Sequence, residues 1–462
     1  MRAAKLFGAA AFLATGLAVI SIAANAQPPA APKKIQFEED HSLPIVYLDI
    51  VSDAGAAQDP PGKLGLANIA SRMLLRGTQR RSKTEFFRKV ELLGGQISVD
   101  GHQQEGMEFH AEVLSENLDR FLDLLEETLV KPKITAEELH KLKKETIGRI
   151  LDQKGDDRAL AGLHFLRFFY GNHPYGNPIL GTQKGVKAIT HKDVLDHYSR
   201  HFGGDTLSLF GSGDASKEKI ERWFSRLIGK LGALHPEAAP VKPLQKPVIP
   251  SGRRTLIVDK PKTTQTQILI GGVGMRPETP QFYAVQLANH SFGGSSFQAR
   301  MMVEIRVKRG WTYGASNYFR FGALPRHFAM HLFPKTDDTP PAIALAVQLF
   351  EDFVKSGLTQ EEFEFARDSL INNAPFNYDT SKKRLSNATN EYFWNFPPGF
   401  FRDFSKNIAA VNYRDIAPAL KAVFRPEDLT LVVVGDAAKL KGELQKLPGF
   451  GKPVVHSYLV EE

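Results

Sequence analysis

The feature that most constrains the fold of this sequence is a long internal repeat. A stretch in the first half recurs 222 positions later in the second half, with seven residue identities preserved. These identities are Asp193, Phe202, Leu207, Leu209, Gly213, Asp214 and Lys217, which return as Asp415, Phe424, Leu429, Leu431, Gly435, Asp436 and Lys439. In each copy the pattern predicts a helix followed by an apolar strand that ends at Gly-Asp.

A second stretch repeats with a slightly different offset. Thr135 and Thr359 each precede two glutamates, a pattern typical of a capped helix start. A strand pair is also predicted, residues 45–55 against residues 268–274. Repeats this long, with an offset that slips, indicate two duplicated domains rather than a solenoid of short units. Alternating apolar residues from Ile45 to Val51 favour a sheet covered by helices, so each half is predicted to be an α+β domain with a mostly antiparallel sheet.

The domain boundaries follow from composition. Residues 235–253 contain five prolines and are predicted to be an extended linker, because proline disrupts helices and central strands. The N-terminal domain is then residues 27–234, and the C-terminal domain is residues 254–462.

Residues 1–26 are predicted to be a signal peptide. Arg2 and Lys5 precede an apolar run that ends in Ala24-Asn25-Ala26, a small-residue pattern typical of a cleavage site. The alternative is an uncleaved membrane anchor. Cleavage would make the mature chain periplasmic or otherwise exported, and no later stretch approaches transmembrane length.

Composition excludes several classes of protein. The chain has no cysteine, which rules out disulfides and cysteine-bound zinc. Removal of Arg2 and Lys5 with the signal peptide lowers the formal net charge from +8 to +6, and the remaining charges form no long run. A nucleic-acid partner is therefore not predicted.

Residues 65–78 carry the sequence Gly-Leu-Ala-Asn-Ile-Ala-Ser-Arg-Met-Leu-Leu-Arg-Gly-Thr. This stretch resembles the zinc helix of the insulinase, pitrilysin and mitochondrial-processing-peptidase family. In that family a Gly-Leu-Ala lead-in is followed by H-x-x-E-H, then by Met-Leu and a Gly-Thr turn. The lead-in and the tail are present here. The resemblance places Asn68 and Arg72 where the two zinc-binding histidines stand in the family, and Ser71 where the general-base glutamate stands.

These replacements remove the zinc chemistry of the motif. Two imidazoles four residues apart share one helix face and can bind one zinc ion, while a neighbouring carboxylate takes a proton from the metal-bound water. An amide, a guanidinium and a hydroxyl provide neither two ligands nor a base. The resemblance also implies a third ligand, a glutamate, near Gly148 or Arg149, and the nearest carboxylate is Glu145, one turn away. No metal and no other cofactor is predicted in this chain.

Two other groups of residues are possible sites that we interpret as structural. His102, with Glu105 three residues on, could replace the lost metal site, but a solvated polar turn between strands is the prediction. A set of aromatic residues could line a peptide-holding chamber, but core packing is the prediction. This set is Tyr392, Phe393, Trp394, Phe396, Phe400, Phe401 and Phe404.

Residues 298–313 resemble a motif of the family's C-terminal half. The resemblance implies that an arginine in a last helix turn and a tyrosine seven residues later reach a zinc site and bind the substrate carbonyl. Here these residues are Arg306 and Tyr313, with Gly310 as the helix stop between them. A purely structural role is the alternative, since an arginine there complements the helix dipole and tyrosine is common in strands. A turn at residues 175–181 extends the resemblance over nearly all of the mature chain, which implies a clam-like pair of homologous domains.

Two functions are consistent with this pattern. The first is the zinc-less subunit of an exported heterodimeric metallopeptidase. A paralogous partner with an intact motif would hold the zinc, and this chain would contribute Arg306 and Tyr313 to a shared peptide-binding chamber. Such a chain would not be a peptidase on its own. The second is a non-catalytic scaffold or peptide-binding module of the same fold, which would need neither residue, while an intact peptidase with an unrecognised metal site is disfavoured by the missing ligands.

Overall fold

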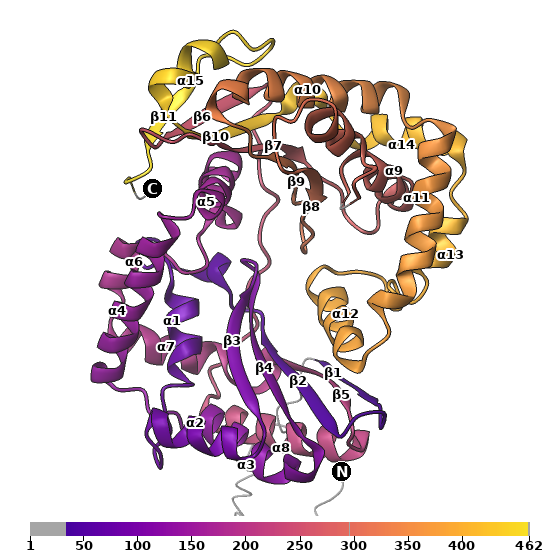
Figure 1. Cartoon of the computed structure of the whole chain (residues 1–462). Coiled ribbons are helices and arrows are strands. Elements are labelled where there is room, and N and C mark those ends of the chain that lie inside the picture. Colours follow the sequence, from indigo (N-terminus) through magenta and orange to yellow (C-terminus); the bar gives the residue numbers. More distant parts are fainter. Residues whose placement is uncertain (1–33, 295, 461–462) are drawn as a thin grey trace, which may run out of the picture.

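The structure, a computed structural model, describes residues 34–294 and 296–460. The predicted signal peptide, residues 1–26, lies outside these residues. The described chain is a mixed α and β protein built around two sheets, one in each half of the sequence (Figure 1). Within these ranges no helix is both long enough and apolar enough to cross a membrane.

The first sheet has five strands. They are β1 (Lys34–Glu39), β2 (Ile45–Ser52), β3 (Gln96–His102), β4 (Gly106–Leu114) and β5 (Leu207–Gly213), in the order β1-β5-β2-β4-β3. Only the β1–β5 pair is parallel. One face is apolar and is covered by α2 (Lys83–Leu92), α3 (Leu118–Val130) and α8 (Lys217–Leu234). A separate apolar cluster joins α1 (Leu66–Met73), α4 (Ala136–Gln153), α6 (Gln183–Ala188) and α7 (His191–His201) beside this sheet.

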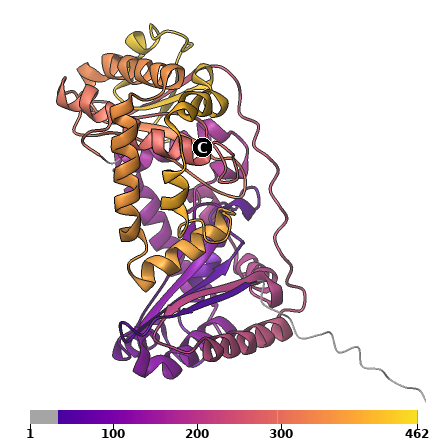
Figure 2. The same cartoon turned by 90° about the vertical axis from the view of Figure 1, so that its right-hand side faces the viewer.

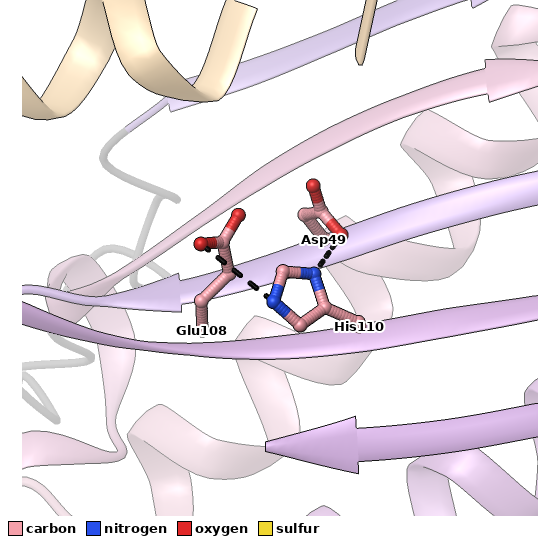
Figure 3. A group of neighbouring side chains, drawn as sticks. All are labelled: Asp49, Glu108 and His110. Atoms are coloured by element: carbon pink, nitrogen blue, oxygen red, sulfur yellow. Dashed lines mark hydrogen bonds and ion pairs between the residues drawn. The ribbon is translucent and has the colours of Figure 1, made fainter. Parts of the chain in front are cut away.

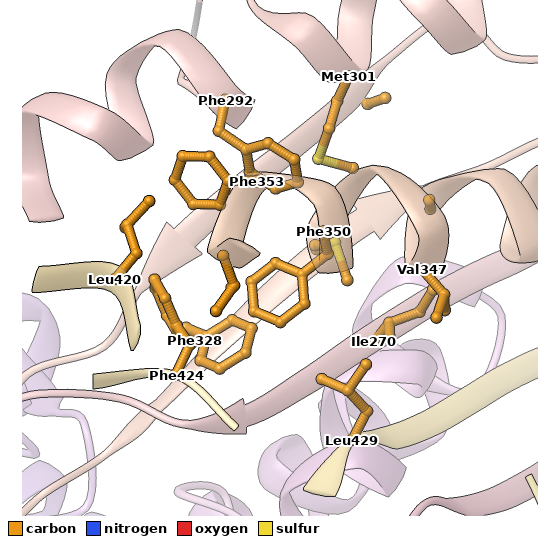
Figure 4. Packing of buried hydrophobic residues seen from close by; sticks show 14 of the residues in the cluster. Ile270, Phe292, Met301, Phe328, Val347, Phe350, Phe353, Leu420, Phe424 and Leu429 are labelled. Carbon is orange, nitrogen blue, oxygen red and sulfur yellow. The ribbon is translucent and has the colours of Figure 1, made fainter. Parts of the chain in front are cut away.

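The second sheet has six strands. They are β6 (Arg254–Asp259), β7 (Gln267–Val273), β8 (Ala315–Phe319), β9 (His327–Leu332), β10 (Thr430–Gly435) and β11 (Val454–Ser457), in the order β11-β6-β10-β7-β9-β8. Its covering helices are α9 (Phe282–Gly293), α10 (Thr339–Ser356), α11 (Gln360–Asn373), α14 (Ile416–Val423) and α15 (Ala437–Leu444), with the short α13 (Phe404–Ala409) beside α9 and α11. Figure 4 shows the centre of this core, where Phe328, Phe350 and Phe424 pack together.

The two sheets repeat one plan, as the sequence duplication predicts. Leaving out β11, each strand of the first sheet has a counterpart at the same place in the second, from β1 and β6 to β3 and β8. The predicted caps are also present, because Thr135 and Thr359 accept backbone hydrogen bonds at the starts of α4 and α11. Two homologous α+β halves with mostly antiparallel sheets are therefore confirmed.

One helix of each half crosses to the sheet of the other half, which the sequence did not predict. Helix α5 (Asp157–Tyr170) packs on β6, β7 and β10 of the second sheet, whereas α12 (Ser381–Phe393) packs on β2 and β5 of the first (Figure 1). Phe165 of α5 is buried against the second sheet, and a Cβ atom on Gly271 would lie 2.7 Å from its ring. The two sheets are thus tied together by exchanged helices.

The chain passes from one half to the other through residues 235–253. This segment lies between the end of α8 and the start of β6 and contains no helix or strand. In Figure 2 it runs as an extended segment along one side of the molecule. It is held at a few points, for example by the Ala239 N–H donating to the Arg200 carbonyl at 3.2 Å.

Candidate functional site

Helix α1 carries the degenerate zinc motif and is firmly positioned. It begins after Gly65, whose φ of 102° is left-handed and suits glycine. The buried Asp59 carboxylate accepts hydrogen bonds from the N–H groups of Gly65 at 2.6 Å and Ala67 at 2.8 Å. Burial raises the pKa of Asp59 to about 7, against the effect of these hydrogen bonds. Ile69 and Met73 then anchor the helix in the cluster with α4 and α7.

Arg72 of α1 is paired with Asn68 and with a strand carboxylate where a zinc ion would bind in the related motif. The Arg72 guanidinium donates from Nε to Asn68 Oδ1 at 2.9 Å and from Nη2 to Asp100 Oδ1 on β3 at 2.9 Å. Asn68 and Ser71 are buried, at 2% and 0% exposure. Burial and the nearby charge of Arg149 lower the pKa of Arg72. A permanent cation therefore occupies the place of the second histidine.

The carboxylate nearest to the expected third ligand is held in an ion pair. Glu145 accepts two hydrogen bonds from Arg76 Nη1, at 2.8 and 3.0 Å, and Arg76 also donates from Nε to Glu138 at 2.9 Å. The Arg76 side chain is 6% exposed, whereas the Glu145 side chain is 52% exposed, so only the arginine of this pair is buried. Arg149 itself adds a second positive charge near Arg72. Arg72 thus stands at the place of the second histidine, and Arg149 lies near the place where the resemblance implies the third ligand.

Arg306 and Tyr313 lie in the second half and have few internal partners. Arg306 is in the last turn of a π-helical segment, Met302–Val307, and its guanidinium lies 4.7 Å from the centre of the Phe297 ring. Gly310 has a φ of 67° and donates to the Arg306 carbonyl at 2.8 Å, so it ends the helix as predicted. Tyr313 is 78% exposed just before β8. Within residues 34–294 and 296–460, no hydrogen bond or ion pair joins Arg306 or Tyr313 to α1.

The turn between β3 and β4 differs from its prediction. It was expected to be solvated, but it inserts between the two halves. The Gln103 amide donates to the Phe321 carbonyl at 3.0 Å, and Glu105 accepts from the Ala323 N–H at 3.0 Å. His102 stacks on Phe393 of α12, with ring centres 3.9 Å apart. A turn tip that meets another domain cannot be distinguished from a solvated one by local sequence.

The aromatic set between residues 392 and 404 packs mainly as predicted. Phe396 and Phe400 belong to the core of the second half, and Trp394, Phe401 and Phe404 are half-buried against it. Tyr392 and Phe393 instead lie on the first sheet beside Phe210. The set therefore joins the two halves.

Sequence reasoning missed one polar cluster, on the face of the first sheet that α12 covers. Asp49 of β2 and Glu108 and His110 of β4 offer ligand atoms that all lie within 4.8 Å of one another (Figure 3). They line a cavity of about 480 Å³ between the sheet and α12.

Burial raises the pKa of Asp49. For His110 burial favours the neutral form, but the hydrogen bond to Asp49 and the charges of Glu108 and Asp49 raise its pKa to about 9. Strand alternation in the sequence could have placed Glu108 and His110 on one face of a strand. It could not have placed Asp49 beside them, because the register between β2 and β4 is not visible in the sequence.

Comparisons with known proteins agree with this architecture. The model for the insulinase family, peptidase family M16, matches residues 34–183, and the model for the peptidase M16 inactive domain matches residues 188–370. The chain is 25% identical to "Non-peptidase homolog YmxG" of Helicobacter pylori over 405 residues, covering 88% of this chain and 92% of that relative.

Solved structures show the same fold. The "peptidase M16 inactive domain" from Pseudomonas fluorescens has a TM-score of 0.81 at 22% identity, covering 88% of this chain and 96% of that one. The "periplasmic protease PqqL" from Escherichia coli has a TM-score of 0.70 at 12% identity, covering 86% of this chain and 43% of that one.

Proposed function

Because this chain belongs to the insulinase family, peptidase family M16, and its zinc motif is replaced, we propose that it is the zinc-less subunit of an exported heterodimeric metallopeptidase. A paralogous partner would hold the zinc ion and its general base. This chain would bind the peptide substrate and present Arg306 and Tyr313 to the partner's zinc site.

The observation that carries the proposal is the contrast between the two half-sites of this chain. At the first, Arg72 is tied to Asn68 and Asp100, so that site is filled by a paired cation. At the second, Tyr313 is 78% exposed and the Arg306 guanidinium lies over the ring of Phe297. Tyr313 is therefore not held by packing in the core of this chain, and its phenol is accessible to another molecule. A π-helical turn at Arg306 supports this, since such turns often occur at functional sites.

Arg306 and Tyr313 have the chemistry to stabilise a developing negative charge. When zinc-bound hydroxide attacks a peptide carbonyl, the carbonyl oxygen becomes an oxyanion only as the transition state forms. A guanidinium and a phenol that donate hydrogen bonds to that oxygen bind the transition state more tightly than the substrate. Their loss should therefore lower turnover more than substrate binding.

The proposal is tested by mixing this chain with a paralogue that carries H-x-x-E-H and measuring peptide cleavage. Activity is expected only in the mixture, because a degenerate motif that has lost its zinc ligands and general base cannot activate water at the peptidase site. In the mixture Tyr313→Phe should lower kcat by about 10²–10³-fold with little change in KM or Tm, as expected for loss of one oxyanion donor. Arg306→Lys should be nearly as harmful, since an ammonium cannot reproduce the planar fork of a guanidinium.

The matched control is Tyr413→Phe. Tyr413 is also partly exposed, at 39%, but its hydroxyl donates to the Leu358 carbonyl within the second half. Its loss should leave kcat unchanged. If the paralogue alone cleaves peptides as fast as the mixture, the shared site is wrong. If the mixture is active but Tyr313→Phe does not alter kcat, this chain is a scaffold.

A further inference from the structure

The cluster of Asp49, Glu108 and His110 has the geometry of a small ligand set. The His110 ring lies between the two carboxylates, with Nδ1 2.9 Å from Asp49 Oδ1 and Nε2 3.8 Å from Glu108 Oε2 (Figure 3). Asp49 and His110 are direct cross-strand partners, and Glu108 lies two residues from His110 on the same face of β4. Regular strands therefore hold all three side chains, which favours a rigid site.

Surrounding groups orient two of these side chains. His102 places Nδ1 3.1 Å from the Oε2 atom of Glu108, and its ring is fixed by stacking on Phe393. The Thr389 hydroxyl of α12 donates to Asp49 Oδ2 at 3.2 Å. Supporting hydrogen bonds of this kind are the usual companions of metal ligands. Since α12 comes from the second half, both halves of the chain contribute to the site.

Two adjacent carboxylates with little exposure are unfavourable unless a cation neutralises them. Asp49 and Glu108 are each 7% exposed, and buried carboxylates are seldom found without a cation or hydrogen-bond donors beside them. The cavity in front of them leaves room for water or another small ligand. Three protein ligands with open positions are typical of metal sites that also bind an exogenous group.

The duplicated sheet provides an internal comparison. Asp49 lies opposite Phe210 and His110, and the equivalent residue of the second sheet, Leu269, lies opposite Val432 and His331. The histidine is thus present at both places. The position equivalent to Glu108 is Ala329, and Leu269 and Ala329 both pack in the apolar cluster under α5. The fold therefore accepts apolar residues at these positions, so it does not itself require the two carboxylates.

We propose that Asp49, Glu108 and His110 bind one divalent transition-metal ion of the zinc or manganese class at the wall of the cavity under α12. Two carboxylate oxygens and one imidazole suit such ions, whereas calcium prefers six to eight oxygen ligands and magnesium a nearly complete octahedron of oxygens. The site uses β2 and β4, so it is distinct from the degenerate motif on α1. It revises the sequence-based expectation of a metal-free chain, and it does not depend on the proposed heterodimer.

The test uses the full mature chain prepared without a polyhistidine tag and stripped with a chelator. Titration calorimetry with Zn²⁺ or Mn²⁺ should show one site per chain, and Ca²⁺ and Mg²⁺ should not bind there. His110→Gln and Glu108→Gln should weaken that binding by more than about 100-fold, because loss of even a supporting group typically lowers metal affinity by about 10–100-fold. His331→Gln, at the equivalent place of the second sheet, is the matched control and should bind as the parent does. Anomalous scattering from a crystal of the zinc complex should place the ion between Asp49 and His110.

Three outcomes would overturn the site. They are no stoichiometric binding of Zn²⁺ or Mn²⁺ by the parent chain, equal binding by His110→Gln, and an ion located on α1 or elsewhere. A preference for Ca²⁺ or Mg²⁺ would also refute the assignment to a transition metal. Circular dichroism and Tm of each variant identify any loss of folding. Glu108→Gln removes a buried charge without changing shape, so it keeps the test available if His110→Gln does not fold.

Discussion

Restoring the three lost residues of the zinc motif should not restore zinc binding. The triple variant Asn68→His, Ser71→Glu, Arg72→His supplies two imidazoles and a base, but Arg149 still stands where the resemblance implies the third ligand. The charge of Arg149 acts on Arg72 in the structure, so it would also repel a zinc ion bound there. Coulomb's law for charges of +1 and +2 separated by about 6–8 Å gives a repulsion of about 2–3 kcal/mol once solvent screening of the exposed guanidinium is included.

This repulsion corresponds to about 30- to 150-fold in Kd, and the missing third ligand weakens binding further. Glu145 cannot easily substitute, since it is paired with the nearly buried Arg76 at 2.8 Å. Adding Arg149→Glu to the triple variant should both remove the repulsion and provide the carboxylate. Adding Arg149→Gln should remove the repulsion alone. We therefore expect zinc affinity to rise from the triple variant to the Gln variant and again to the Glu variant.

The measurement is competition for zinc against a chromophoric chelator. All variants carry His110→Gln, so that the cluster with Asp49 does not take the ion. A triple variant that holds one zinc ion as tightly as the Arg149→Glu variant would refute the reasoning. It would show that another carboxylate completes the site or that the third ligand has been misplaced.

Two further predictions concern stability. Phe165→Ala should lower the free energy of unfolding, measured in urea, by about 3–5 kcal/mol, because Phe165 is 1% exposed against the sheet of the opposite half. The control is Phe376→Ala, which should change this free energy by less than about 0.5 kcal/mol because Phe376 is 64% exposed. A small effect of Phe165→Ala would mean that the crossing of α5 contributes little. Burial lowers the pKa of His197 to about 3 and that of His201 to about 4, so the folded state holds both neutral while the unfolded chain takes up protons below about pH 6.5. The free energy of unfolding should then fall with decreasing pH, by about 2 kcal/mol per histidine at pH 5. If it falls as steeply in His197→Gln as in the parent chain, this assignment is wrong.

Local sequence was sufficient for the features that depend on neighbours along the chain. Thr135 and Thr359 were recognisable as helix caps, because a threonine hydroxyl at a helix start can accept a hydrogen bond from the backbone N–H three residues later. Gly310 was recognisable as a helix stop because glycine adopts positive φ without strain. The loss of zinc ligands at Asn68 and Arg72 followed from the resemblance to the family motif together with the chemistry of the two side chains.

Features that join distant segments could not be predicted in the same way. The exchange of α5 and α12 between the halves depends on contacts such as Phe165 with Gly271, which are far apart in sequence. The pairing of Glu145 with Arg76 was also not visible, so a carboxylate that seemed available near the motif is in fact bound.

The sequence by itself determined the duplication, the family and the loss of the zinc motif, since these reside in residue identities and in periodic patterns. Only the tertiary structure decided that Arg72 fills the degenerate site and that Tyr313 is exposed. It also decided that Asp49 meets His110. Strand alternation gives the face on which a side chain lies, but the partner across the sheet depends on register, and register is set by the packing of the whole domain.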